Sequence, residues 1–320
     1  MGHLTHISFA TDPGRPIRTP SSSATNNKNA LDLVNLNRLM ELSRGRAETT
    51  IALIDGPVAT DHPDLSTTTI REIPGRLGGT CAHASSFACM HGTFVAGILC
   101  SSRDSSAPSI APACTLLVRP IFAESASGHS SMPSATPEEL ANAIIDCTEA
   151  GAHVINLSAA ISQPSASGER KLNEALDSCA KRGSVVVAAA GNEASIGSST
   201  ITRHPWVIPV VACDLRGQPM AFSNFGNSIG RRGLSAPGDG ITSLSAEGKP
   251  PTFAGTSAAA PFVTGAIALL NSIFPKATGA EVKLALMQSY TRRRSTIVPI
   301  LLDAWAAYQI LQHAQRRSER

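Results

Sequence analysis

Short apolar runs alternate with helix-like segments along most of this chain. Continuous runs of four to nine apolar, mostly β-branched residues are typical of strands buried on both faces. Four such runs lie at residues 49–55 (TTIALID), 153–158, 184–192 and 206–214. Segments of helical periodicity separate them, such as 136–152, where apolar residues recur every three or four positions. The alternation predicts an α/β fold with a mostly parallel central sheet and helices on both faces.

The chain divides into two parts by composition. Residues 1–30 are rich in Pro, Ser, Thr and Asn, which predicts a disordered or loosely attached arm. A short helix is expected at 30–45, so residues 1–48 form an N-terminal arm with one helix. Residues 49–320 contain neither a linker nor an internal repeat and are predicted to be a single domain.

Charge and hydropathy exclude several classes of partner. The net charge is only +3, and the basic clusters lack the interleaved aromatic residues of a nucleic-acid platform. We expect no apolar run to approach the ~20 residues of a membrane span, and the first residues do not resemble a secretory signal. The sequence therefore predicts a cytoplasmic protein that binds neither nucleic acid nor membrane.

The seven cysteines lack the C-x-x-C spacing of a zinc site. Cys147 and Cys179 fall on apolar faces of predicted helices, where a free cysteine behaves as a small hydrophobic residue. Four others lie between residues 81 and 114. These four could include a disulfide, although a cytoplasmic location favours free thiols. No acidic cluster forms a calcium loop, so neither a metal nor another cofactor is expected.

Four polar residues stand where an open parallel sheet places its active site, beyond the carboxyl ends of the strands. Asp55 ends the first strand, and Asn192 follows the run that begins at residue 184. His91 is predicted to open one helix and Ser257 another. A serine hydroxyl needs a base, imidazole can take and return its proton, and a carboxylate holds the imidazole in one tautomer.

Each residue also has a purely structural interpretation. A carboxylate after a strand is typical of a turn, and a histidine at a helix start is often only structural. Ser257 could be a helix N-cap, accepting a hydrogen bond from a nearby backbone N–H. The four residue types together favour a Ser–His–Asp relay, with the Asn192 amide donating to the oxyanion.

The strings around these residues resemble the signature blocks of the subtilisin-like serine proteases. ALIDGPVATDHPDL surrounds Asp55, HGTFVAGIL begins at His91, VVVAAAGNE contains Asn192, and GTSAAAPFVTGAIALL contains Ser257. The blocks occur in that family's order and the likeness extends over roughly residues 48–275. It implies that Asp55, His91 and Ser257 are the catalytic triad and that Asn192 is the oxyanion donor.

The resemblance also implies a set of substrate-binding residues. Residues 156–160 would pair with an extended peptide as an added strand. Glu193 would lie at the pocket for the residue before the scissile bond, where it either favours basic or polar side chains or faces solvent with little selectivity. Two alanines replace the family's usual Gly-Gly and are expected to narrow the pocket entrance. The full set is Asn156, Ser158, Ala159, Ala160, Gly191 and Glu193.

Further strings resemble the leader-cleaving proteases of cyanobactin-type peptide biosynthesis, among them APACTLLVRPIF and GRRGLSAPGDGITSL. The likeness implies cleavage of a ribosomal precursor peptide. A related macrocyclase carries extra helices between its Asp and His, and the short Asp55–His91 interval favours hydrolysis over transamidation. The alternatives are a macrocyclase, a general intracellular protease, and a catalytically silent peptide-binding relative.

Overall fold

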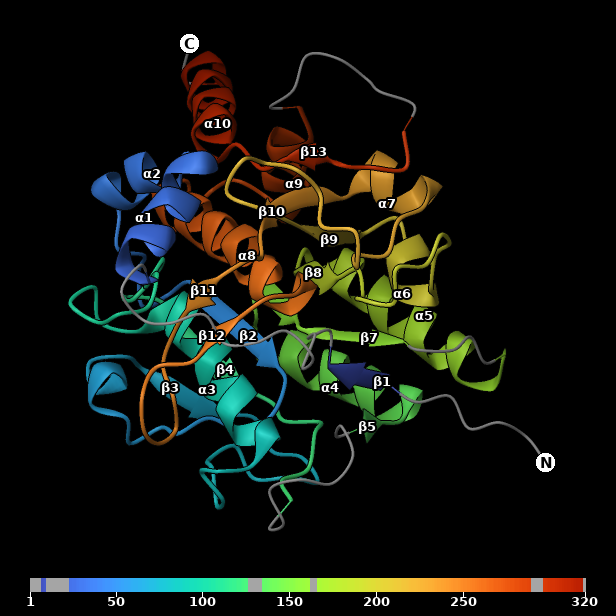
Figure 1. The fold of residues 1–320 in the computed structure, drawn as a ribbon. Coiled ribbons are helices and arrows are strands. Elements are labelled where there is room, and N and C mark those ends of the chain that lie inside the picture. The colour runs from blue at the N-terminus through green and yellow to red at the C-terminus, as the bar shows by residue number, and fades with distance from the viewer. Residues whose placement is uncertain (1–6, 10–22, 126–133, 162–165, 289–295, 319–320) are drawn as a thin grey trace.

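An eight-stranded parallel sheet forms the centre of the molecule (Figure 1). The structure is a computed structural model that describes residues 7–9, 23–125, 134–161, 166–288 and 296–318. The strand order is β13-β10-β9-β8-β6-β2-β4-β3, and every neighbouring pair is parallel. The predicted α/β class is confirmed. The strands are β2 (Thr50–Ile54), β3 (Ile70–Glu72), β4 (Thr115–Val118), β6 (Val154–Leu157), β8 (Val185–Ala189), β9 (Val207–Cys213), β10 (Leu234–Pro237) and β13 (Ile300–Leu301).

Helices cover both faces of this sheet, as its fully buried strands require. Side chains alternate between the two faces of a strand, so neighbouring residues pack into the hydrophobic cores on opposite faces of the sheet. Val154 packs with helices α3 (Phe87–Cys100) and α8 (Thr256–Ile273), whereas Ile155 packs with α4 (Pro137–Glu149) and α5 (Ala166–Arg182). The predicted start of α4 is confirmed, since the Thr136 side chain accepts a hydrogen bond from the Glu139 N–H.

The described residues 23–48 pack against the domain, whereas most of the arm predicted at residues 1–30 lies outside the described residues. Two helices, α1 (Ser23–Leu33) and α2 (Leu36–Leu42), replace the single helix predicted at 30–45. They break at Asn35, which adopts the left-handed conformation that asparagine tolerates (φ 55°). Leu36 is fully buried in the main core. The Asn27 amide bonds the backbone of Thr242, 215 residues away.

Helix α8 corrects the expectation that no apolar run reaches the length of a membrane span. It has 18 residues with a mean hydropathy of 1.3, which is enough on length and composition. However, 94% of it is buried inside the protein, because it contacts β6, β8, β9 and β10. It is the core helix of the fold.

Smaller elements complete the described chain. Strand β1 (Ile7–Phe9) lies between β5 (Ser134–Ala135) and β7 (Ala159–Ile161) in a three-stranded antiparallel sheet (Figure 1). The remaining elements are the 3-10 helix η2 (Pro63–Leu65), the hairpin of β11 (Ile241–Thr242) and β12 (Thr252–Phe253), and helices α6 (Thr200–Arg203), α7 (Asn227–Arg232), α9 (Gly279–Gln288) and α10 (Ala304–Ser318).

Candidate active site

Asp55, His91 and Ser257 form one hydrogen-bonded chain. His91 Nδ1 lies 2.7 Å from Asp55 Oδ1, and His91 Nε2 lies 3.1 Å from Ser257 Oγ. All three residues are fully buried. One imidazole nitrogen therefore faces a carboxylate and the other faces the hydroxyl, which is the geometry that lets imidazole take a proton from serine.

Different elements carry the acid and the base. Asp55 follows the last residue of β2, at the carboxyl edge of the sheet, as predicted. His91 lies in the second turn of α3 and does not open it. The helix begins four residues earlier because the Ser86 hydroxyl caps it by accepting a hydrogen bond from the Cys89 N–H.

Ser257 is the second residue of α8, so the N-cap interpretation is wrong. Gly255 occupies the cap position, and the N–H of Thr256, the first residue of α8, donates to a side chain from another loop. The Ser257 hydroxyl is directed to His91 instead. The first turn of α8 contributes the positive end of the helix dipole beside this oxygen, which favours negative charge developing nearby.

Asn192 places an unpaired hydrogen-bond donor beside the start of α8. Its Oδ1 accepts a hydrogen bond from the Thr256 N–H at 3.0 Å, which fixes the orientation of the amide. Its Nδ2 is buried and, in the part of the chain that the structure describes, has no hydrogen-bond partner. A buried amide nitrogen without a partner costs about 1–3 kcal/mol. An oxyanion formed at Ser257 would satisfy it.

Two glycines bring α3 against the turn that follows Asp55. A Cβ on Gly92 would lie 2.3 Å from the Pro57 carbonyl oxygen, and one on Gly56 would lie 2.0 Å from the carbonyl oxygen of Ala88. No side chain fits at either position. Direct backbone contact sets the separation between Asp55 and His91, and the periodicity of the sequence did not reveal it.

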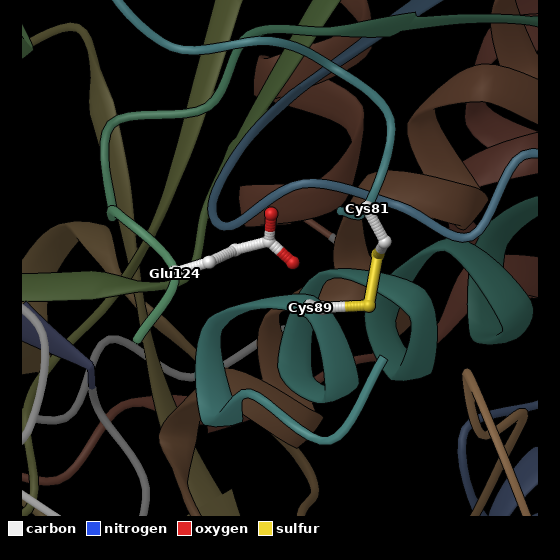
Figure 2. Close-up of side chains that lie close together, drawn as sticks. All are labelled: Cys81, Cys89 and Glu124. Carbon is white, nitrogen blue, oxygen red and sulfur yellow. A yellow bond between two sulfur atoms is a disulfide. The ribbon is translucent and has the colours of Figure 1, made fainter. Parts of the chain in front are cut away.

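A disulfide joins Cys81 to Cys89 just before His91, where free thiols were expected (Figure 2). Glu124 points its carboxylate at the same loop and accepts hydrogen bonds from the N–H groups of Ala82 and His83. The three possible ligand atoms lie within 4.8 Å of one another. Because both sulfurs are bonded to each other, the cluster is a cross-link with no thiolate for a metal.

The five other cysteines are free and buried, as expected for Cys147 and Cys179. Burial raises the pKa of the Cys179 thiol to about 11 and that of Cys213 to about 12. Their thiolates, the reactive form, are therefore suppressed near neutral pH.

Gly191 and Glu193 lie on the loop that carries Asn192. We define the pocket rim as residues 193–195 together with Asn224. Asn224 Oδ1 accepts hydrogen bonds from the Glu193 and Ser195 N–H groups, and its Nδ2 donates to the exposed Glu193 carboxylate. Gly191 has φ +104°, a conformation that favours glycine. No sequence motif marks Asn224 as part of this region.

The first part of the predicted substrate strand uses its side chains inside the protein. The Asn156 side chain donates a hydrogen bond to Ser158 Oγ and accepts one from Thr264 Oγ1 of α8. The side chains of Asn156 and Ser158 are therefore hydrogen-bonded within the protein. Ala159 and Ala160 begin β7, and their side chains lie outside the described residues. The expected narrowing of the pocket by their methyl groups stays a prediction.

Comparisons with known proteins agree with this geometry. A thermostable alkaline protease of Halalkalibacterium halodurans is 30% identical over 75% of this chain and 62% of its own length. The chain thus spans about 60% of the length of the first curated relatives. The self-cleaved protease domain of PatA is 31% identical, with a TM-score of 0.70 over 84% of this chain and 98% of that one.

The prenylagaramide maturation protease PagA is 29% identical, with a TM-score of 0.74 over 86% of this chain and 98% of that one. The PatG macrocyclase in complex with peptide shares the fold at 21% identity, with a TM-score of 0.72 over 87% of this chain and 95% of that one. A family model described as the subtilase family, Peptidase_S8, matches residues 46–302. This chain belongs to the subtilase family.

Proposed function

We propose that this chain is a serine endopeptidase in which Ser257 is the nucleophile, His91 the general acid–base, Asp55 the orienting carboxylate and Asn192 the oxyanion donor. The single observation that carries the proposal is the continuous hydrogen-bonded chain from Asp55 through His91 to Ser257. The unpaired Nδ2 of Asn192 supports it independently.

The proposed roles lead to the following steps. Ser257 Oγ attacks the scissile carbonyl carbon while His91 Nε2 takes its proton, and the carbonyl oxygen becomes an oxyanion that accepts a hydrogen bond from Asn192 Nδ2. His91 then protonates the leaving amine, which departs and leaves an acyl-enzyme. A water molecule, deprotonated by the same nitrogen, attacks the ester carbonyl, and His91 returns that proton to the departing Ser257 Oγ as the acid is released. Asp55 keeps the proton of Nδ1 in place throughout.

The surroundings of His91 favour this chemistry. Phe253 stacks on the imidazole at a centroid distance of 6.5 Å, and Phe87 lies at 6.0 Å. Apolar rings beside the relay limit water on that side. Lower local polarity strengthens the hydrogen bonds on which the relay depends.

We further propose that the substrate is an extended segment of a ribosomal precursor peptide and that the reaction is hydrolysis. The support is similarity, because the prenylagaramide maturation protease PagA and the patellamide maturation protease PatA share about 30% identity with this chain over most of its length. Such a peptide would pair with β7 as an added strand.

A fluorophosphonate probe tests the nucleophile. The folded protein should be labelled at Ser257, and Ser257→Ala should abolish the labelling. An unlabelled, folded wild-type chain would contradict the peptidase proposal.

Mass spectrometry of a candidate precursor peptide tests the reaction type. Two linear fragments whose masses sum to the precursor plus one water are expected. A product lacking one water relative to the linear fragment would instead indicate a macrocyclase.

A further inference from the structure

Two cysteines and a carboxylate converge at the start of α3 (Figure 2). Cys81 Sγ, Cys89 Sγ and a carboxylate oxygen of Glu124 lie within 4.8 Å of one another, and the two sulfurs are joined as a disulfide. None of the three side chains belongs to the catalytic relay. Reduction would leave two thiols and one carboxylate in this small space, and such a set of donors is typical of zinc sites.

The segments that carry these three side chains are held together independently of the disulfide. The Cys81 N–H donates to the Val58 carbonyl. The Ile121 N–H, three residues before the glutamate, donates to the Asp55 carbonyl. Cys89 belongs to α3, which packs directly on the turn after Asp55. Breaking the bond between the sulfurs would therefore leave the three donor groups close together.

Glu124 is already oriented toward the loop between the two cysteines. Its Oε2 accepts a hydrogen bond from the Ala82 N–H at 2.8 Å, and its Oε1 accepts from the His83 N–H at 2.9 Å and the Ser86 hydroxyl at 3.3 Å. Each carboxylate oxygen can accept twice, so Oε2 retains a lone pair for a metal. Hydrogen bonds of this kind commonly orient a carboxylate that ligates a metal.

Both sulfurs lie where negative charge is favoured. Cys89 is the third residue of α3, beside the positive end of the helix dipole. Thr93 Oγ1 lies 3.9 Å from Cys81 Sγ. Because that oxygen already accepts from the Ala59 N–H, its own proton is available to the sulfur. These surroundings suit thiolates, the form of cysteine that binds metal.

The spacing of the backbone suits a single tetrahedral ion. The Cα atoms of Cys81 and Cys89 are 5.5 Å apart. With Zn–S bonds of about 2.3 Å, two sulfurs of a tetrahedral site are about 3.8 Å apart, and rotation about the two Cα–Cβ bonds can provide that separation. Among the residues that the structure describes, no fourth His, Cys, Asp or Glu joins the group. Water, which reaches the half-buried Cys81 and Glu124, would be the fourth ligand.

We propose that this cluster is a redox-gated metal site, a disulfide when oxidised and a site for one Zn²⁺ when reduced, with Cys81, Cys89 and Glu124 as ligands. A dithiol reductant supplies two electrons and two protons. The reductant becomes a disulfide, and the two cysteines become thiols. Zn²⁺ then replaces the two thiol protons, which pass to water. The proposal goes beyond the peptidase function and does not rest on it, because neither step involves the triad.

Zinc titration of the full-length chain tests the site, in the Ser257→Ala background so that no peptide bond is cut. The chain is reduced with a dithiol, freed of it by gel filtration under nitrogen, and titrated with Zn²⁺ against a chromophoric chelator. The oxidised chain, treated identically, is the control, because it retains the five buried free cysteines. We expect one Zn²⁺ per reduced chain, with a Kd lower than that of the oxidised chain by about 100-fold or more. Equal affinity of the two forms would overturn the proposal.

Variants of the reduced chain identify the ligands. Cys81→Ser and Cys89→Ser should each abolish the tight site, and Glu124→Gln should raise the Kd by about tenfold or more. Glu72→Gln is the matched control, because Glu72 also accepts from this loop, at the Gly79 N–H, but lies outside the cluster. It should leave the Kd unchanged. An unchanged Kd in Glu124→Gln would overturn the proposal, since binding by an unfolded reduced chain would not need that carboxylate.

Cobalt provides a spectroscopic readout of the same site. Thiolate-bound Co²⁺ absorbs in the near ultraviolet by charge transfer, and tetrahedral Co²⁺ absorbs strongly in the visible. The reduced chain should show both absorptions and the oxidised chain neither. Zn²⁺ should also raise the thermal midpoint of the reduced chain and leave that of the oxidised chain unchanged. Only the weak visible absorption of octahedral Co²⁺ in the reduced chain would contradict the proposed ligands.

Discussion

The triad and the pocket rim lie side by side but are held in opposite ways. Asp55, His91 and Ser257 are fully buried and joined by two hydrogen bonds, and close backbone contacts at Gly56 and Gly92 fix their spacing. The rim exposes Glu193 to solvent and is held mainly through the side chain of Asn224. Packing holds the residues that make and break bonds. The residues expected to select a substrate are exposed, so water competes for their hydrogen bonds. Substitutions should therefore have large effects in the triad and small ones at the rim.

The largest effect is expected at the nucleophile. Ser257→Ala removes the attacking oxygen, so kcat for a fluorogenic peptide should fall by about 10⁶. Ser272→Ala in the same helix is the matched control, because its hydroxyl bonds Ala268 and Thr49 rather than the relay. The control should retain wild-type kcat. A comparable loss in both variants would mean that the helix, and not the hydroxyl, is responsible.

The oxyanion donor comes next. Asn192→Ala should lower kcat by about 10²–10³. Asn192→Asp keeps an oxygen to accept from the Thr256 N–H but replaces the Nδ2 donor with a second acceptor, so it should lose at least as much activity. The thermal midpoint of each variant is measured alongside. Full activity in Asn192→Asp would exclude Nδ2 as the donor.

Backbone contact beneath the triad is tested by Gly92→Ala. The added methyl would lie 2.3 Å from the Pro57 oxygen and must push α3 away from Asp55. Since displacing a catalytic group by about 1 Å costs up to 10²-fold, kcat should fall by roughly 10- to 100-fold. Gly78→Ala is the control, because nothing lies within 4 Å of its Cβ position. Wild-type kinetics in Gly92→Ala would show that this contact is not needed.

The Cys81–Cys89 cross-link should support stability more than chemistry. The two cysteines are 8 residues apart in sequence. The double variant Cys81→Ala with Cys89→Ala should therefore have a free energy of unfolding, measured by urea denaturation, about 2–3 kcal/mol lower than the wild type. The glycine contacts remain, so kcat should change by less than about fivefold. Reductant should lower the stability of the wild-type protein and leave the double variant unchanged.

Thiol titration tests the assignment of one disulfide and five buried free cysteines. The native protein should expose no reactive thiol before reduction and two after it, because the five free cysteines are buried and the pKa of Cys179 is raised to about 11. At pH 8 their thiolate fraction stays small, and it grows only as the pH approaches the raised pKa. More than two thiols reacting quickly after reduction would contradict this arrangement.

The smallest effect is expected at the rim. Glu193→Gln keeps the shape of the side chain and removes an exposed charge, worth about 0.2–1 kcal/mol. The ratio of kcat/KM for peptides with lysine and with glutamine before the scissile bond should change by less than about fivefold. A change above 20-fold would show that the rim recognises charge strongly and would break the contrast with the triad.

Local pattern was sufficient for the alternating strands and helices and for the capped start of α4. The strings that resemble the subtilases marked Asp55, His91, Asn192 and Ser257 as candidates. Each depends on residues close in sequence, because apolar periodicity sets the element and a motif is a string of consecutive residues. The same reasoning misplaced the start of α3, because the cap at Ser86 lies outside the apolar pattern that was used to find the helix.

Other features depend on contacts between distant segments. Three examples join residues far apart in sequence. They are the hydrogen bonds from Asn224 to the rim, the packing of α1 and α2 on the core, and the pairing of β1 with β5 and β7. The Cys81–Cys89 bond is local, yet whether two sulfurs meet is decided by the path of the loop. By itself, the sequence determined the fold class and the residues capable of catalysis. Only the tertiary structure decided how they are oriented and where β1 pairs, because those outcomes depend on packing between distant segments.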